Sequence, residues 1–163
     1  MDENNLTADL VILGHVARDI NVINDTEHQE VGGAVYYGGI AASHMGLKVF
    51  VITRLKQEDF PLLKEFEKYG IHCHATPSSG TSGIQNIYES SNMEERVCKP
   101  LDFAGEFTKE EIPSKIKAKF FVLAPILAGE INKELLEFLH ENHAGRLCLD
   151  IQGFIRQRDL EEN

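Results

Sequence analysis

The sequence lacks the features that mark several classes of protein. It has no tryptophan and only 5 prolines in 163 residues, which excludes a collagen-like or proline-rich chain. Its 3 cysteines form no Cys-x-x-Cys pair, which argues against a disulfide framework and favours a reducing, cytoplasmic compartment. The acidic N-terminus is unlike a signal peptide, and no apolar run reaches the roughly 20 residues of a membrane-spanning helix. The sequence therefore predicts a soluble intracellular protein.

Positive charge is also scarce. The chain has 16 Lys and Arg against 26 Asp and Glu, which gives a formal net charge of -10. Such a charge disfavours binding to nucleic acid or to an anionic membrane, although a helix N-terminus can still hold a phosphate on an acidic protein. With 42% hydrophobic residues and 13 glycines, the composition is that of an ordinary globular chain, long enough for one domain with a substantial core.

Four short apolar runs have the character of buried strands, and longer segments with helical periodicity separate them. This alternation predicts an α/β fold, namely a Rossmann-like parallel sheet with helices on both faces. Asp59 is expected to cap one helix, and Thr108 with Glu111 fits a capping box. The expected strands span 10–13, 49–53, 119–123 and 146–149, and the main helices span 34–45, 59–69 and 132–143.

More polar strands cluster in two places, near 19–31 and 71–98. Because these segments are too polar for a buried sheet, we interpret them as a small β lid over the sheet edge where ligands of α/β folds usually bind. The whole chain, 1–163, is then a single α/β domain with a lid. In the second cluster the expected strands are 71–76, 83–88 and 93–98, with a hairpin turn at 90–92.

The most informative segment is rich in glycine. Gly32 and Gly33 precede a small-residue helix that contains Gly38 and Gly39 and ends at Gly46. Glycine pairs at a helix start permit close backbone approach and leave N–H groups free for a ligand. Equally, they permit the helix to pack tightly on the sheet. The segment is not a P-loop, because no Gly-Lys-Ser/Thr follows, and it lacks the Gly-x-Gly-x-x-Gly of dinucleotide-binding proteins.

These segments, in this order, resemble the ribokinase-like (PfkB) family of carbohydrate and nucleoside kinases. Asp19 and the strand before it resemble the family's substrate-binding Asp and first strand. The segment from Gly32 to Gly46 matches the family's N-terminal glycine-pair signature, including its length. The other matching segments are 49–54, 81–88 and 149–156.

The resemblance covers the whole chain but only the first half of the family's fold. It implies ATP-dependent phosphorylation of a sugar or polyol hydroxyl, Mg²⁺ accompanying ATP, and a homodimer joined through the lids or an exposed sheet edge. The family's second signature, a Gly-Ala-Gly-Asp-type loop that carries the general base and the anion hole, is absent after Gly46. Phosphoryl transfer depends on such positioning and electrostatic stabilisation, so this chain alone is expected to be inactive and to hold no catalytic residue.

The resemblance assigns substrate binding to Asp19, Gly32, Gly33 and Tyr37. The Asp19 carboxylate would accept hydrogen bonds from vicinal hydroxyls, or it is a solvated strand charge. The two glycines would form the hinge between lid and core, or a simple turn. Tyr37, where ribose-type members carry Asn, would stack on a sugar face or pack on its helix. Ribose is therefore not the expected substrate, and inositol- or sugar-kinase-like members are the closer resemblance.

Three more residues complete the candidate site. Gln85 and its neighbour Asn86 point to opposite faces of one strand, so at most one of them faces a pocket. Arg96 would meet an anionic group, or it remains solvated on its hairpin. Asp150, at the end of the last expected strand, would support the phosphate site, or it caps the following turn. We include Gln85 and Arg96 as substrate-binding candidates and Asp150 as a phosphate-site candidate.

Metal and nucleophile chemistry are not expected of this chain. His72 with His74, and His140 with His143, each bring two ligands but no third at zinc spacing. No cysteine has a partner base that is visible in the sequence.

Two functions remain open at this point. One is the substrate-binding half of a carbohydrate or inositol kinase, and the other is a non-catalytic module that binds a sugar, polyol or nucleoside. In both cases a sheet cut midway leaves an uncovered edge, which predicts a protein that is not a monomer.

Overall fold

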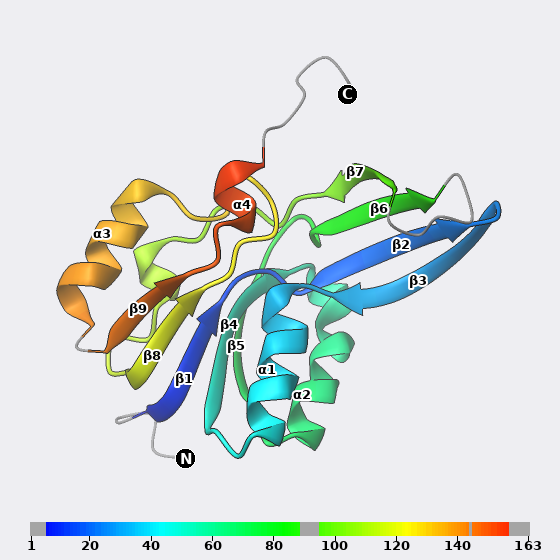
Figure 1. The fold of residues 1–163 in the computed structure, drawn as a ribbon. Coiled ribbons are helices and arrows are strands. Elements are labelled where there is room, and N and C mark those ends of the chain that lie inside the picture. The colour runs from blue at the N-terminus through cyan, green and yellow to red at the C-terminus, as the bar shows by residue number, and fades with distance from the viewer. Residues whose placement is uncertain (1–5, 89–94, 144, 157–163) are drawn as a thin grey trace.

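The computed structural model describes residues 6–88, 95–143 and 145–156 (Figure 1). Within them the chain forms two β-sheets, with helices packed around the larger one. The strands are β1 (Thr7–Leu13), β2 (Ala17–Ile23), β3 (Thr26–Gly32), β4 (Val49–Leu55), β5 (His72–Pro77), β6 (Gly83–Tyr88), β7 (Val97–Asp102), β8 (Lys117–Leu123) and β9 (Arg146–Leu149). The helices are α1 (Ala34–His44), α2 (Lys64–Lys68), α3 (Lys133–Asn142) and α4 (Gln152–Ile155), with 3₁₀ helices η1 (Gln57–Leu63) and η2 (Lys109–Glu111).

The larger sheet is parallel and has the strand order β5-β4-β1-β8-β9. β1 lies at its centre, where Val11 and Leu13 are completely buried. Helices α1 and α2 cover one face, on which Val35 and Phe66 pack, and α3 covers the other, on which Leu139 packs (Figure 1). The structure therefore confirms the expected parallel α/β sheet with helices on both faces.

The smaller sheet, which we call the lid, has the strand order β3-β2-β6-β7. β2 and β3 form an antiparallel hairpin whose turn residues, Asn24 and Asp25, have φ of 49° and 58°, as a type I′ turn requires. β6 runs parallel to β2, and β7 runs antiparallel to β6. The lid extends beyond the carboxyl end of β1 (Figure 1). The hairpin turn expected at 90–92 lies outside the described residues.

One strand that we expected in the lid belongs to the larger sheet. The lid was predicted to include all strands of 71–98, but β5 pairs in parallel with β4. As an edge strand, β5 has a half-buried His72 and an exposed His74, while Cys73 packs against the core. Because this exposure pattern is the same as that of a half-solvated lid strand, polarity alone could not separate the two positions.

The helix expected at 59–69 is divided into two elements. The 3₁₀ helix η1 contains Pro61, and α2 follows it. Proline has no N–H donor for an α-helical hydrogen bond, which is consistent with the late start of the α-helix. Asp59 does not cap this helix, because its carboxylate instead accepts hydrogen bonds from Arg18 and Thr81 at the base of the lid.

Other helix ends follow their sequence signals. Gly46 follows α1 with a φ of 82°, as a glycine after a helix C-terminus commonly has. The side chain of Asn132 accepts a hydrogen bond from Leu135 N at 2.7 Å and so caps α3. Thr108 and Glu111 form the expected capping box at η2. No helix within the described ranges has the length and apolar character to cross a membrane.

Candidate functional site

The carboxylate of Asp19 lies at the base of the lid. Strand β2 carries it, and the Ile84 N–H of the neighbouring strand β6 donates to its Oδ1 at 2.8 Å. None of the described residues donates a hydrogen bond to Oδ2. Burial raises the pKa of Asp19 above its usual value, as does Glu30, while the Ile84 N–H and Arg156 act in the opposite direction. The carboxylate is thus fixed through one oxygen and can accept a ligand hydroxyl through the other.

Gly32 and Gly33 make room for this arrangement. A Cβ at Gly32 would lie 2.3 Å from Asp19 Oδ2, so a larger residue would displace the carboxylate. Gly33 has a φ of 96°, and a Cβ there would lie 2.4 Å from the carbonyl oxygen of His15. Both positions therefore require glycine, because a side chain would clash with Asp19 in one case and with the loop between β1 and β2 in the other.

The two adjacent tyrosines of α1 have different environments. Tyr36 packs against Phe66, with the ring centroids 5.8 Å apart. Tyr37 is 58% exposed, and its hydroxyl donates to the carbonyl of Val31 at 3.1 Å. Burial raises the pKa of Tyr37, and the carboxylates of the lid hairpin, including Asp19, raise it further. Tyr37 therefore lies near Asp19 with much of its ring accessible, whereas Tyr36 is a packing residue.

Two asparagines share the Asp19 face of the lid. Side chains alternate along a strand, so Asn21 points to the same side of β2 as Asp19. Asn86 Nδ2 donates to Asn21 Oδ1 at 3.0 Å, which places Asn86 on that face too. Gln85, which pairs with Ile20 in the register of the two strands, points to the opposite face. Of the neighbouring residues Gln85 and Asn86, it is therefore Asn86 whose side chain lies on the same face of the lid as Asp19. Asn21 could have been predicted on this face from the sequence, because it is two residues after Asp19 on the same strand.

Arg96 and Asp150 lie farther from the Asp19 carboxylate. Arg96 Nε contacts Cys98 Sγ at 3.4 Å, and that thiol contacts Asn86 Oδ1 at 3.2 Å, so Arg96 is linked to the same face of the lid. Asp150 lies at the carboxyl end of β9, where its Oδ1 accepts the Gln152 N–H at 2.9 Å. This contact is local to the turn after β9, and Ile151, not Asp150, is the N-cap residue of α4.

Arg156 places a cation close to the Asp19 face. It follows α4, and its Nη1 donates to the carbonyl of Ile126 at 2.5 Å. Its charge lowers the pKa of both Asp19 and Glu130, in each case as the smallest of several effects. The resemblance covered the segment 149–156 without indicating this proximity, because the contact spans elements far apart in the sequence.

A cavity of about 510 Å³ lies on the other side of the lid base, between the β2–β3 hairpin and η1. Alternation along β2 turns the side chains of Arg18 and Asp19 to opposite faces. Arg18 Nη1 bonds Asp59 Oδ1 at 2.9 Å across this cavity's edge. The cavity therefore belongs to the Arg18 side, although the backbone of β2 forms part of its wall. Its lining includes Arg18, Lys56, Leu62, Thr81 and Leu101, and Asp19 and Glu30 of the hairpin also border it.

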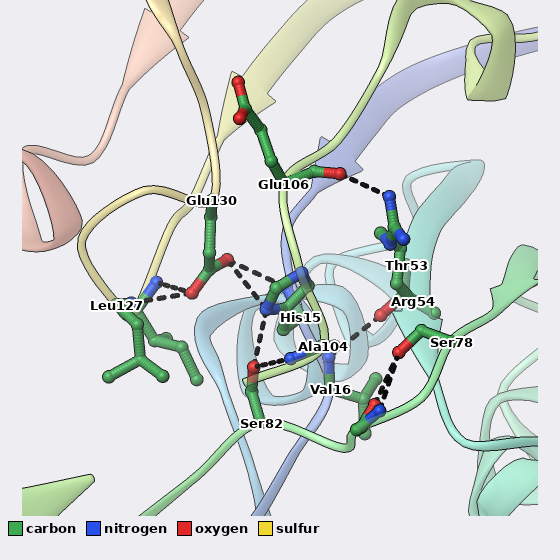
Figure 2. Close-up of polar contacts among 12 residues, drawn as sticks. His15, Val16, Thr53, Arg54, Ser78, Ser82, Ala104, Glu106, Leu127 and Glu130 are labelled. Atoms are coloured by element: carbon green, nitrogen blue, oxygen red, sulfur yellow. Dashed lines mark hydrogen bonds and ion pairs between the residues drawn. The ribbon is translucent and has the colours of Figure 1, made fainter. Parts of the chain in front are cut away.

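A buried polar cluster lies where the lid joins the larger sheet (Figure 2). We call His15, Ser82, Ala104 and Glu130 the junction cluster. His15 Nδ1 and Ser82 Oγ are 2.7 Å apart, Ser82 Oγ accepts the Ala104 N–H at 3.0 Å, and Glu130 Oε2 accepts the His15 N–H at 3.3 Å. Sequence reasoning missed this cluster, because its members are separated by 67 and 115 residues and none belongs to a recognisable motif.

A divalent cation would find no protein cage here. No group of three His, Cys, Asp or Glu side chains in the described part of the chain is placed to hold a metal ion.

No family model and no curated protein matches this chain. Solved structures do match. The sulfate complex of a pyrophosphate-dependent kinase in the ribokinase family matches it with a TM-score of 0.83 and 28% sequence identity, over 92% of this chain and 52% of that one. The fold is ribokinase-like.

Two further structures agree with this conclusion. A pyrophosphate-dependent kinase in the ribokinase family, in complex with a pyrophosphate analogue and myo-inositol, has 27% identity and a TM-score of 0.82, over 92% of this chain and 52% of that one. Ribokinase from Thermotoga maritima has 14% identity and a TM-score of 0.69, over 93% of this chain and 55% of that one. At this identity the match supports the fold alone. The ribokinase-like chain thus spans about half the length of these structures, as the sequence resemblance implied.

Proposed function

We propose that this chain is the substrate-binding part of a kinase that phosphorylates a hydroxyl of a sugar or polyol. The observation that carries the proposal is the Asp19 carboxylate, which the Ile84 N–H holds through one oxygen while the other lies over Gly32. A carboxylate forms strong, charge-assisted hydrogen bonds with hydroxyl donors, and vicinal hydroxyls are the characteristic groups of sugars and polyols. The similar structure that contains myo-inositol makes a cyclic polyol the first ligand to test.

The residues around Asp19 suit such a ligand. Gly32 and Gly33 let the backbone approach it closely, and the exposed ring of Tyr37 offers an apolar surface to a sugar face. Asn86 adds a polar side chain to the same face of the lid. We assign substrate binding to these residues with Asp19, while Gln85 faces away from them.

The donor is proposed to be a polyphosphate with Mg²⁺. The sequence resemblance implies ATP, and a ribokinase from Arabidopsis thaliana with a similar fold has been solved with ribose and ATP. The two more similar structures are of pyrophosphate-dependent kinases, so pyrophosphate is the second donor to test. The sequence contains no Gly-x-Gly-Asp after Gly46. The general base and anion site are therefore proposed to come from a further polypeptide segment, and a non-catalytic binding module remains the second candidate function.

Thermal unfolding with myo-inositol, ribose and adenosine tests the binding site. We expect a polyol to raise the Tm of the wild-type chain, and Asp19→Ala to abolish that rise. The matched control is Glu137→Ala, because Glu137 is an exposed carboxylate on α3, which lies against the larger sheet away from Asp19. A full ligand-induced shift in Asp19→Ala, or no shift with any of the three ligands in the wild type, would contradict the proposed site. Because this chain alone is expected to be inactive under both candidate functions, the kinase is separated from the binding module by consumption of ATP or pyrophosphate, with the bound ligand, in a polypeptide that also contains the segment proposed to supply the general base.

A further inference from the structure

We propose that His15 is a positioning residue, which locks the lid to the larger sheet through Ser82 and Glu130 and thereby holds Asp19 in place for its ligand. The inference rests on the proposed function in one respect, namely that Asp19 binds the ligand. The lock itself is independent of that function.

Within the described residues, four connections join the lid to the rest of the chain, and they come together around His15 and Ser82. The first, from β1 to β2, contains His15 itself, and the second, from β3 to α1, brings Gly33 against the His15 carbonyl oxygen. The third enters β6 through Ser82, which contacts His15 Nδ1 at 2.7 Å. The fourth leaves β7 through Ala104, whose N–H donates to Ser82 Oγ at 3.0 Å. The contact between His15 and Ser82 therefore lies where these four connections come together: the His15 ring touches one of them directly, and Ser82 passes the contact on to Ala104.

Glu130 anchors the other side of His15 to the larger sheet. Its Oε2 accepts the His15 N–H at 3.3 Å (Figure 2). Its Oε1 accepts the N–H groups of Ile126 and Leu127 at 2.9 Å and 2.6 Å. These two residues belong to the loop that follows β8, so the carboxylate ties the lid connection to the carboxyl end of the sheet.

The His15 ring is held in one state. It is completely buried and lies between Phe103 and Phe107, at ring-centroid distances of 5.8 Å and 4.9 Å. Burial and the charge of Arg54 lower the pKa of His15 to about 3, so the ring is neutral. Ser82 Oγ also accepts the Ala104 N–H, and its contact with His15 Nδ1 is one hydrogen bond whose direction follows the tautomer of the ring. Breaking the contact would leave buried polar groups unsatisfied.

The position of Asp19 follows from this lock. Asp19 is on the strand that His15 leads into, and Ile84, which donates to the Asp19 carboxylate at 2.8 Å, is on the strand that Ser82 leads into. The contact between His15 and Ser82 therefore fixes the two strands at the point just before they form the site. Ligand binding needs both strands in place, because one carries the carboxylate and the other carries the N–H that orients it.

Four variants test the proposal by two measurements, hydrogen exchange of the amides and the Kd for myo-inositol. Ser82→Ala removes one buried oxygen, and His15→Leu removes the ring nitrogen that contacts it. His15→Asn restores a polar atom near the Nδ1 position, and its amide can either donate or accept. Ser43→Ala is the matched control, because Ser43 Oγ donates to the Tyr69 carbonyl at 2.6 Å on the far side of α1 from the lid connections. All are made in the full chain.

We expect Ser82→Ala and His15→Leu to speed exchange at Ile84 and Ala104 at least tenfold relative to β1, and to weaken myo-inositol binding about tenfold. His15→Asn is expected to recover most of the exchange protection and most of the myo-inositol affinity. Ser43→Ala is expected to change neither the exchange rates nor the affinity. The proposal is overturned if Ser82→Ala exchanges and binds like the wild type, or if exchange rises equally in the lid and in β1. If His15→Leu fails to fold, the result for Ser82→Ala alone tests the proposal. If the wild type does not bind myo-inositol, the proposed function is contradicted, and the exchange rates still show whether His15 and Ser82 hold the lid to the larger sheet.

Discussion

Among single residues, Gly32 has the most specific structural requirement. Its missing side chain provides the space for Asp19 Oδ2, which would lie 2.3 Å from a Cβ at this position. We predict that Gly32→Ala displaces the carboxylate, weakens polyol binding at least tenfold and lowers the free energy of unfolding by about 1–3 kcal/mol, as overpacking does. Isothermal titration and urea unfolding measure the two effects.

Gly38→Ala is the matched control for this prediction. A Cβ at Gly38 would meet only Ile12 Cδ1, at an ordinary 3.7 Å. Because alanine is the better helix former, we expect this variant to raise the free energy of unfolding by about 0.5–1 kcal/mol, with unchanged binding. Equal losses of affinity in the two variants would show that Gly32 matters for the helix rather than for Asp19.

At the same scale, the buried pair His15 and Glu130 predicts how stability depends on pH. Burial is the main cause of both shifts: the pKa of His15 falls from 6.5 to about 3, and that of Glu130 rises from 4.5 to about 7. His15 adds stability that is present above pH 6.5 and lost as pH falls toward 3. Glu130 adds stability that is present below pH 4.5 and lost as pH rises through 7. The two opposing slopes cancel between 4.5 and 6.5, which predicts a plateau with losses on either side.

Glu130→Gln isolates the alkaline side of this profile. The amide keeps an oxygen for the N–H groups of Ile126 and Leu127 but cannot ionise. We therefore expect the fall in stability between pH 6.5 and 7.5 to disappear. The acidic fall due to His15 is then no longer cancelled, so it begins at pH 6.5 and the plateau is lost. Urea unfolding at half-unit intervals from pH 4 to 8 measures this, with the exposed Glu137→Gln as control. An unchanged alkaline fall in Glu130→Gln would contradict the assignment.

The sequence identified some of these residues and not others for a physical reason. Asp19, Gly32 and Gly33 could be proposed as site residues from the sequence because they belong to short segments that resemble a family motif. His15 and Glu130 make contact across 115 residues, and each looks like an ordinary polar residue in its own segment. Only the packing of β1 beside β8 brings them together.

At the scale of elements, the apolar runs predicted most of the larger sheet. β9 begins and ends where expected, and β1, β4 and β8 extend the predicted runs by a few residues. The error at β5 has a physical origin, because a solvated edge strand of the core sheet and a lid strand have the same alternating polarity. Which sheet such a strand joins is decided by its pairing with β4, and its own residues do not encode that partner.

Helix α3 offers a test of local sequence signals away from the site. Asn132 caps it by accepting the Leu135 N–H at 2.7 Å, and Leu135 and Leu139 fix the helix to the core. We predict that Asn132→Ala lowers the free energy of unfolding by about 0.5–2 kcal/mol, whereas Asn132→Asp keeps the capping oxygen and costs much less. Ligand affinity should be unchanged in both. A loss as large in Asn132→Asp as in Asn132→Ala would contradict the capping role.

At the scale of the whole molecule, apolar side chains remain uncovered at one end of the larger sheet. No described strand pairs with the outer edge of β9. Beside that edge, Leu149, Ile151 and Ile155 are 44%, 58% and 70% exposed. Apolar groups clustered at a free sheet edge favour association with another chain. The lid has a second such region on β7, where Val97 and Leu101 are 41% and 43% exposed.

We therefore predict that the chain is not monomeric at micromolar concentration, and that the β9 edge is the interface because its side chains are the more exposed. Sedimentation velocity of the wild type should show a dimer or larger species, and Ile151→Asp with Ile155→Asp should dissociate it. The control is Met45→Lys, since Met45 is 80% exposed but lies at the end of α1, away from both edges. If the double variant Val97→Asp with Leu101→Asp dissociates the protein instead, the interface lies on the lid. A monomeric wild type would refute the prediction for both surfaces.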